Sequence, residues 1–595
     1  MRKVYLALAV LTYLTPISVR AVETAAARTI AIDEIRAGMH GVAYTVFQGT
    51  QPEAMDVEVL GILRDVNGPK SDLILVRLHG KKIEYTGVVA GMSGSPVYLD
   101  GRLAGALSYR IGEFSKEPIA GVTPIGEMLE ISALDRRPES AATTAKAGLS
   151  GASKTSSPGE ASTTKIASYA NLMKPIGAPL VFSGFRDETI QQFAAKFSSA
   201  GVVPVMGAGS VSTDMKQPEA IEPGSAVSAI LVRGDMGIAA TCSVTYMDPQ
   251  RLLACGHPLL QYGTVNLPMT KANVLATLPS PANAFKIVNA TEPIGSFVQD
   301  RHTGIMGLLG KDPEMIAVTL TVHGGPSDKT FHYEVLNNAR LSPVAMMATV
   351  FNALRGMNEY GEETTYRMNG QISVAGYPKV KLENMYAPVD GSAPAAMLAA
   401  LSVGDRFSRI FDNPYEQPTV NGVQLDFNLV KERRWARLEN VHTDVTEARP
   451  GDDITVEAVL RPYRGEGIVK QITMHVPTSV SRGPLRILVS DGSTLDQFRH
   501  STPALASKLD LASTIATLNK EHSNNSLYVS LLEADPEAMV ADKVMPTLPL
   551  SVMNVMEGMR GTQEMVVLGE SSVNEASTPL DYVVSGAQLL TINIK

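Results

Sequence analysis

A serine held in a glycine turn is the residue of this chain whose surroundings most favour chemistry. It is Ser93, in residues 91–96, which read Gly-Met-Ser-Gly-Ser-Pro. Glycine lets the backbone approach a reacting group closely, so the amides of Gly91 and Ser93 could point at one spot and form an oxyanion hole. An Asp100-Gly101 turn follows at hairpin spacing and would anchor the loop in a sheet. The pattern favours a nucleophilic serine, although glycine-serine turns before hairpins also occur in purely structural loops.

A histidine far along the chain could supply the base that a serine nucleophile requires. His257 lies between Gly256 and Pro258, at the end of a predicted strand. Proline restricts the backbone after it and glycine frees the backbone before it, which would aim the imidazole at a fixed point. The expected role of His257 is to take the proton of Ser93 on attack and return it to the leaving group, which requires hydrogen-bond contact. The alternative is a structural or solvent-exposed histidine.

The acid that would orient His257 is less well defined. Asp300 is favoured because it lies in the same predicted half of the molecule, although an ion pair with Arg301 or a turn cap explains it equally well. Asp72 and the neutral His79 are weaker candidates. The histidines and cysteines show no metal-ligand spacing, so the sequence predicts no metal and no other cofactor.

The two cysteines of the chain, Cys242 and Cys255, flank an Asp248-Pro249 turn. A two-residue loop at this turn would place the cysteines directly opposite each other in a hairpin. Opposed positions bring Cβ atoms to roughly 4.5–5.5 Å, which is close to what a disulfide needs. We expect a Cys242–Cys255 disulfide in an oxidising compartment; the alternative is a pair of small buried residues on one sheet face.

Several blocks of the sequence resemble the SpoIVB-type serine peptidases, a family of sporulation signalling proteases. The serine block is residues 86–96, Thr-Gly-Val-Val-Ala-Gly-Met-Ser-Gly-Ser-Pro. The other similar blocks are residues 55–60, 121–129, 244–257 and 294–307. The resemblance implies a chymotrypsin-like fold of two β-barrels and an endopeptidase that cleaves protein or peptide substrates. It also implies Ser93 as the nucleophile and His257 as the base.

The chain departs from the family in two ways. In the family the histidine precedes the serine, whereas here Ser93 precedes His257, so the two halves are exchanged in order; triad geometry permits this. The family's aspartate lies just upstream of its serine, where residues 78–80 carry no carboxylate. Two further interpretations therefore stay open. One is a catalytically inactive binding or scaffold protein of the cell envelope with the same fold, and the other is a protease that processes only itself.

The N-terminus and the charge restrict location and partners. Arg2 and Lys3 precede an apolar run at residues 4–14 and small residues at 19–21, which is typical of a cleaved signal peptide. The sequence shows no other stretch that could span a bilayer, so we expect an exported, periplasmic or extracellular protein without a transmembrane segment once mature. A formal net charge of −8 and the absence of a polybasic run argue against nucleic acid as a partner.

A length of 595 residues suggests about three domains in a mainly β fold. Six strands of a first, serine-bearing barrel are predicted at residues 43–47, 55–64, 73–77, 85–89, 96–99 and 102–108. The full predicted order is a signal peptide at 1–21, this barrel at 29–133, a flexible linker at 137–165, a histidine-bearing barrel with a helical insertion at 203–385, and a C-terminal β-sandwich-like domain with helical additions at 427–595.

Overall fold

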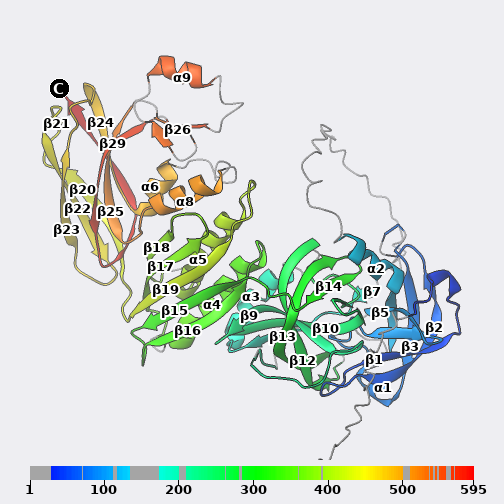
Figure 1. Ribbon diagram of the computed structural model, residues 1–595. Coiled ribbons are helices and arrows are strands. Elements are labelled where there is room, and N and C mark those ends of the chain that lie inside the picture. Colours follow the sequence, from blue (N-terminus) through cyan, green and yellow to red (C-terminus); the bar gives the residue numbers. More distant parts are fainter. Residues whose placement is uncertain are drawn as a thin grey trace, which may run out of the picture.

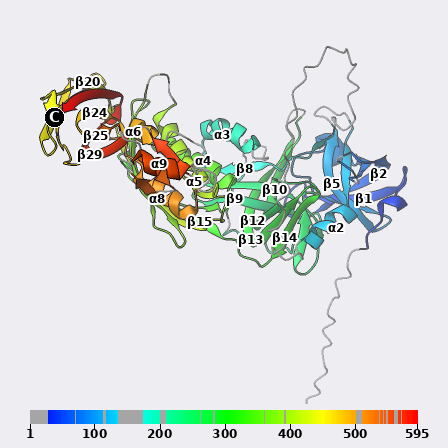
Figure 2. The same ribbon diagram turned by 90° about the horizontal axis from the view of Figure 1, so that it is seen from above.

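The computed structural model describes residues 28–134, 173–199, 209–499 and 509–595. Short gaps within these ranges fall at 67, 70, 112–116, 213, 261–262, 281–283, 359–360, 390, 392, 535–536, 541–542, 546–548, 558–564 and 569. The expected signal peptide and the linker at 137–165 lie outside the described residues. The fold is mainly β, as the sequence predicts, and its parts follow one another in a row from the first barrel to the C-terminal sheets (Figures 1 and 2).

Six antiparallel strands between residues 40 and 124 close into the first barrel. They are β1 (His40–Thr45), β2 (Glu53–Leu63), β3 (Leu73–His79), β4 (Pro96–Leu99), β5 (Arg102–Ile111) and β6 (Ile119–Pro124). The order is β4-β1-β2-β3-β6-β5, and pairing of β4 with β5 completes the circle. Alternating apolar residues of these strands fill the interior. Asp100 and Gly101 both have positive φ and join β4 to β5, as the predicted turn requires.

One predicted strand of this barrel is wrong. Residues 85–89 do not form a strand, because helix α1 (Lys81–Thr86) runs into them and a loop follows. Gly80 and Gly87, both at positive φ, bracket that helical turn. The sixth strand is instead β6, and it leads directly into helix α2 (Ile125–Leu134).

A second closed barrel of six antiparallel strands spans residues 226–309. Its strands are β9 (Ala226–Gly234), β10 (Gly237–Met247), β11 (Arg251–Ala254), β12 (Gly263–Leu278), β13 (Phe285–Arg301) and β14 (Gly304–Leu309). The order is β9-β12-β13-β14-β11-β10, closed by pairing of β9 with β10. Two segments precede this barrel: β7 (Met173–Pro175), which pairs with β5, and β8 (Leu180–Ser183), which pairs with β10. Helix α3 (Asp187–Ser199) then buries Phe193 and Phe197 in the same core.

The sheet continues past the second barrel into an α/β layer at residues 315–430. Its strands are β15 (Met315–His323), β16 (Lys329–Leu336), β17 (Thr365–Val374), β18 (Val380–Tyr386) and β19 (Val420–Val430), and its helices are α4 (Leu341–Met357) and α5 (Ala395–Phe411). Strand β16 pairs with β9, which joins this layer to the barrel. The barrel strands therefore end at Leu309, short of the predicted boundary at 385. The sequence could not show this boundary, because strands of an open sheet and of a closed barrel have the same alternation of apolar and polar residues.

The C-terminal region contains the predicted β-sandwich. One sheet has the order β23-β22-β20-β30 and the other β21-β31-β24-β25-β29, with an apolar core between them. The strands are β20 (Trp435–Thr443), β21 (Glu447–Ala448), β22 (Asp453–Pro462), β23 (Ile468–His475), β24 (Gly483–Ser490), β25 (Ser526–Glu533), β29 (Ser571–Pro579), β30 (Val583–Ser585) and β31 (Ala587–Ile594). Added to it are α6 (Gly492–Arg499), α8 (Leu511–Lys520), β26 (Glu537–Val540), β27 (Lys543–Met545), α9 (Leu550–Glu557) and β28 (Met565–Leu568). Within the described ranges, no helix combines the length and apolarity of a membrane span.

Candidate functional site

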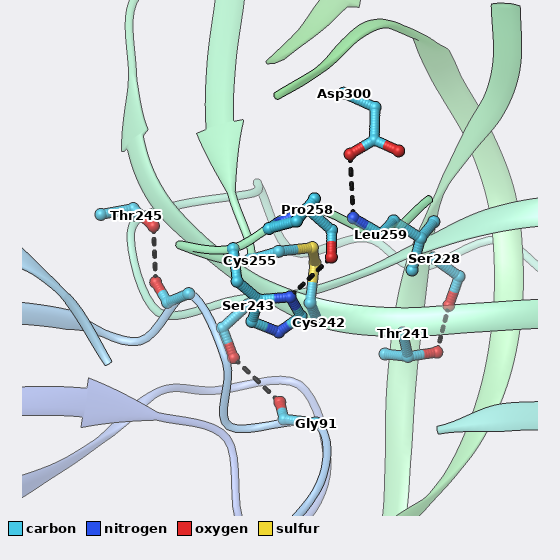
Figure 3. The surroundings of a disulfide bond; sticks show 12 residues. Gly91, Ser228, Thr241, Cys242, Ser243, Thr245, Cys255, Pro258, Leu259 and Asp300 are labelled. Carbon is cyan, nitrogen blue, oxygen red and sulfur yellow. Dashed lines mark hydrogen bonds between the residues drawn. A yellow bond between two sulfur atoms is a disulfide. The ribbon is translucent and has the colours of Figure 1, made fainter. Parts of the chain in front are cut away.

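The Ser93 loop is bound to strand β10 of the second barrel. The Ser243 amide donates to the Ser93 carbonyl oxygen at 2.7 Å. The Ser243 hydroxyl donates to the Gly91 carbonyl at 3.2 Å, and the Thr245 hydroxyl donates to the Gly94 carbonyl at 2.8 Å (Figure 3). The loop that carries the predicted nucleophile is therefore positioned by the other barrel.

Gly94 is required by this close approach. Its φ of +91° is in the left-handed region, which side chains rarely adopt. A Cβ atom at this position would overlap the Ser243 carbonyl oxygen and lie 2.5 Å from the Cys255 amide nitrogen. Only glycine can place the Ser93 loop this close to the second barrel.

His257 lies at the same contact and is almost fully buried, at 4% exposure. The adjoining Gly256 accepts a hydrogen bond from the Thr123 hydroxyl of the first barrel at 2.7 Å. The imidazole Nδ1 lies 2.8 Å from the Pro258 carbonyl oxygen, and Nε2 lies 2.6 Å from the Ile176 carbonyl oxygen. Burial lowers the pKa of His257 and so favours the neutral ring. A neutral imidazole has one N–H, so only one of these two contacts is a hydrogen bond in that state.

The predicted Ser93–His257 hydrogen bond is absent from this conformation. The Ser93 hydroxyl is fully buried and has no hydrogen-bond partner among the described residues. Both ring nitrogens of His257 face main-chain carbonyls instead. The structure thus brings the two loops to one inter-barrel contact but does not join the two side chains.

A segment that the sequence analysis missed lies between the two loops. The Gly91 amide, a predicted oxyanion-hole donor, donates to the Gly177 carbonyl at 3.0 Å. The preceding residue, Ile176, presents its carbonyl to His257 Nε2. The predicted oxyanion amide and the predicted base therefore contact adjacent carbonyls of one segment. An Ile-Gly pair carries no chemical pattern, so no signal in the sequence could have indicated it.

Asp300 is placed to hold the histidine loop rather than the histidine ring. Its buried carboxylate, on β13, accepts a hydrogen bond from the Leu259 amide at 2.8 Å (Figure 3). It accepts a second one from the Leu260 amide at 2.6 Å. An orienting acid would contact Nδ1 of His257, but the Pro258 carbonyl lies against that nitrogen instead. The expected contact of Asp300 with His257 Nδ1 is thus replaced by contacts with the two residues after Pro258.

The two weaker acid candidates lie elsewhere in the first barrel. The Asp72 carboxylate is paired with Arg64 at 2.5 Å. His79 lies 3.4 Å from the Glu58 carboxylate. Neither of these contacts involves the loops of Ser93 or His257.

Cys242 and Cys255 form a disulfide bond with a Cα–Cα distance of 5.2 Å. The turn differs from the expected two-residue loop, because Met247 pairs with Leu252. The Asp248 carboxylate accepts from two amides inside the turn and so stabilises the longer loop. A bulge between Val244 and Tyr246 shifts the register by one residue, so that Cys255 lies opposite Ser243 and close enough to the neighbouring Cys242 for the bond. The disulfide joins the strand that binds the Ser93 loop to the loop that carries His257.

A buried lysine beneath the serine loop was also missed. Lys286 is fully buried, and its ammonium group donates to the Thr45 hydroxyl at 2.8 Å. Its side-chain carbons lie 3.2–3.4 Å from where a Cβ of Gly91 would be. Burial lowers the pKa of Lys286 to about 7. Lys286 lies in a β pattern, where a lysine is normally at the solvent face, so the sequence does not indicate this position.

A comparison with protein families supports a serine peptidase relationship for the first barrel. Residues 16–123 match the family model of the SpoIVB peptidase S55. The match includes the Ser93 loop and ends before His257. Neither a curated protein nor a solved structure matches the chain. In the described part of the chain, no group of three or more histidine, cysteine or acidic side chains could hold a metal ion.

Proposed function

We propose that this chain is an exported serine endopeptidase of the SpoIVB type, in which Ser93 and His257 act together where the two barrels meet. One observation carries the proposal. The Gly91 amide and His257 Nε2 reach the carbonyls of adjacent residues, Gly177 and Ile176. The two carbonyls belong to consecutive residues of one extended segment. The proposed oxyanion donor, the Gly91 amide, and the proposed base, His257, can therefore contact neighbouring peptide groups of one bound chain.

In the proposed reaction His257 Nε2 takes the proton from the Ser93 hydroxyl as the oxygen forms a bond to the substrate carbonyl carbon. The amides of Gly91 and Ser93 stabilise the oxyanion. His257 then gives the proton to the amine that leaves as the peptide bond breaks. Water then attacks the resulting Ser93 ester while His257 takes its proton. The ester bond breaks as His257 returns that proton to the Ser93 oxygen.

The tautomer of His257 fits this role without a direct carboxylate partner. If Nδ1 carries the proton and donates to the Pro258 carbonyl, Nε2 has the free lone pair that a base needs. Asp300 holds the amides of Leu259 and Leu260 and thereby fixes the loop that presents the Pro258 carbonyl. We therefore propose Asp300 as a positioning residue. The exchanged order of the serine and histidine halves is part of the same proposal.

A fluorophosphonate probe, which reacts with activated serines, tests this function on the folded full-length chain. We expect labelling of Ser93 that is lost in Ser93→Ala and strongly reduced in His257→Ala. The matched control is Ser95→Ala, in the same buried loop, whose hydroxyl donates to the Met92 carbonyl at 2.7 Å; this variant should label like wild type. Labelling that survives in His257→Ala would show that another group is the base.

The second candidate is a non-catalytic binding or scaffold protein of the cell envelope. It is favoured by the fully buried Ser93 hydroxyl without a partner among the described residues. If the folded wild-type chain and its variants all fail to label, the scaffold is the better interpretation.

A further inference from the structure

Strand β7 lies on the first barrel without belonging to its closed circle of strands. It pairs antiparallel with the end of β5, with Tyr109 opposite Pro175, Arg110 opposite Lys174 and Ile111 opposite Met173. The β4–β5 pairing that closes the barrel stops at Ala106. Strand β7 therefore occupies the edge of β5 that β4 leaves uncovered.

The chain after β7 remains extended along the candidate site. The Ile176 amide donates to the Ser108 carbonyl at 2.8 Å, which continues the pairing with β5. Its carbonyl then faces His257 Nε2 at 2.6 Å. The next carbonyl, that of Gly177, accepts from the Gly91 amide at 3.0 Å. Residues 173–177 thus run along a sheet edge and end with a carbonyl on the predicted oxyanion amide.

This is the geometry by which an enzyme binds an extended peptide. Addition of a peptide strand to a sheet edge supplies main-chain hydrogen bonds, and pockets for single side chains supply selectivity. Preorganised amides then receive the carbonyl that reacts. The side chain of Ile176 is fully buried in the core of the first barrel. A Cβ on Gly177 would meet no described atom within 4 Å.

We propose that residues 173–177 occupy the substrate position of this protein, so that the chain blocks its own site until the segment is displaced. The inference rests on the proposed peptidase function. The substrate it implies is an extended peptide that adds to the same edge of β5. Such a peptide would carry an apolar residue at the position of Ile176, followed by a residue whose carbonyl takes the place of the Gly177 carbonyl.

The ring of His257 has a different hydrogen-bond role when the segment is bound. An N–H on Nε2 donates to the Ile176 carbonyl at 2.6 Å, which is a normal hydrogen-bond distance and too short for two facing lone pairs. Once Ile176 leaves, the proton can move to Nδ1, which donates to the Pro258 carbonyl, and the lone pair of Nε2 becomes free to accept the Ser93 proton. Release also lets a substrate or water reach the Ser93 hydroxyl. Burial of the Ile176 side chain and this hydrogen bond hold the segment in place.

A reversible cross-link tests whether the segment blocks the site. Arg110 and Lys174 are directly opposed across β5 and β7, and Lys174 is exposed, so Arg110→Cys with Lys174→Cys can form a disulfide between the strands. We expect the oxidised double variant to label at Ser93 about tenfold more slowly than wild type, with recovery on reduction. The reason is that only molecules with the segment displaced can react, and the cross-link lowers the fraction of such molecules.

Two controls accompany the cross-link. The double variant Arg110→Ser with Lys174→Ser loses the same side chains without a cross-link, and wild type with and without reductant reports the effect of the native Cys242–Cys255 bond. If the cross-linked protein labels as fast as the Arg110→Ser, Lys174→Ser double variant, the segment does not block the site. That result would overturn the inference and leave the proposed peptidase function in place.

The opposite variant releases the segment. Ile176→Ser removes the buried apolar side chain and should raise the labelling rate about tenfold or more. Ile74→Ser, which removes a buried apolar side chain from the same core but lies outside the segment, should label at the wild-type rate. Equal rates for these two variants in folded protein contradict the inference. If even folded Ile176→Ser does not label, the inference and the proposed peptidase function fail together. Should Ile176→Ser not fold, the cross-linked protein decides.

Discussion

Two histidines, the buried His257 where the barrels meet and the partly buried His522 beside the C-terminal sandwich, have opposite electrostatic surroundings. His257 faces two neutral carbonyl oxygens, and burial lowers its pKa. His522 lies between the Asp496 carboxylate at 2.5 Å and the Glu575 carboxylate at 3.0 Å. Burial opposes its charge as well, but the hydrogen bonds to these carboxylates outweigh it and raise the pKa of His522 to about 9.

The difference distinguishes His257, which we propose as the base, from His522, which its surroundings hold as an imidazolium. A neutral imidazole keeps a lone pair that can accept a serine proton, whereas an imidazolium held by two carboxylates has none to offer. The barrel contact also contains a buried serine hydroxyl without a partner among the described residues, whereas both ring nitrogens of His522 are taken by the carboxylates of Asp496 and Glu575. Chemistry is therefore expected at the barrel contact, and His522 is expected to contribute to stability.

The largest expected effect compares these two histidines directly. His257→Gln should lower the rate of fluorophosphonate labelling at Ser93 by roughly 10²–10⁴-fold, the usual contribution of a general base. His522→Gln should leave that rate unchanged, because the sandwich does not supply the base. Timed labelling followed by mass spectrometry measures both. A similar loss in the two variants would show that labelling follows overall stability and not the base.

The next effect concerns how tightly the barrels meet. Gly94→Ala forces a methyl group into the backbone of β10, and overpacking of this kind should cost about 3 kcal/mol of stability. Gly101→Ala is the matched control, since Gly101 also has positive φ but would place its methyl group where no described atom lies within 4 Å. Denaturant unfolding measures the loss of stability in both variants. The loss in Gly101→Ala reports the backbone strain alone, and the additional loss in Gly94→Ala reports the contact with β10. Equal losses would mean that the inter-barrel approach is not the cause.

The disulfide should stabilise the barrel side of the molecule only. Replacing Cys242 and Cys255 together by serine should cost about 2–3 kcal/mol, because a bond that closes a loop this short restricts the unfolded chain by that amount. Thermal unfolding should show a lower transition for the barrels and an unchanged one for the sandwich. Mass spectrometry of wild-type protein purified from its native compartment, under non-reducing conditions, should find no free thiol, and two free thiols would contradict the bond.

The smallest effect is a pH dependence of opposite sign in the two regions. The raised pKa of His522 gives stability that is fully present below about 6.5, the unfolded value, and is lost as pH rises through about 9. His257 has a lowered pKa, so the unfolded chain binds its proton more readily and the barrels lose stability as pH falls below about 6.5. Melting curves across pH 5–10 measure both trends. In His522→Gln the alkaline loss should become smaller, and an unchanged alkaline loss would exclude His522 as its source.

Much of the fold follows from local patterns in the sequence. The strands predicted at 73–77 and 102–108 lie within β3 and β5. These predictions succeed because burial of one face imposes a residue period that can be read locally. The strand predicted at 85–89 fails because a short apolar run is compatible with a strand or with a helical turn and loop, and Gly80 and Gly87 decide for the second.

The cysteine hairpin shows how a correct pairing can follow from an incomplete register. The expected two-residue loop is wrong, because the longer turn offsets the two strands. Cys242 and Cys255 are still bonded, because the bulge in β10 removes part of that offset. Neither the capping by Asp248 nor the bulge could be read from residue spacing, since both depend on which side-chain and main-chain groups find partners after folding.

By itself the sequence determined the chemistry-bearing loops, the mainly β architecture and the cysteine pair, because these depend on residue type and on spacing over a few positions. Only the tertiary structure decided what surrounds Ser93 and His257. Ile176 is 81 positions from His257, Asp300 is 41 positions from Leu259, and Lys286 is 195 positions from Gly91. Such contacts arise when two closed barrels are brought together, and no local pattern of residues encodes which carbonyl then lies against which nitrogen.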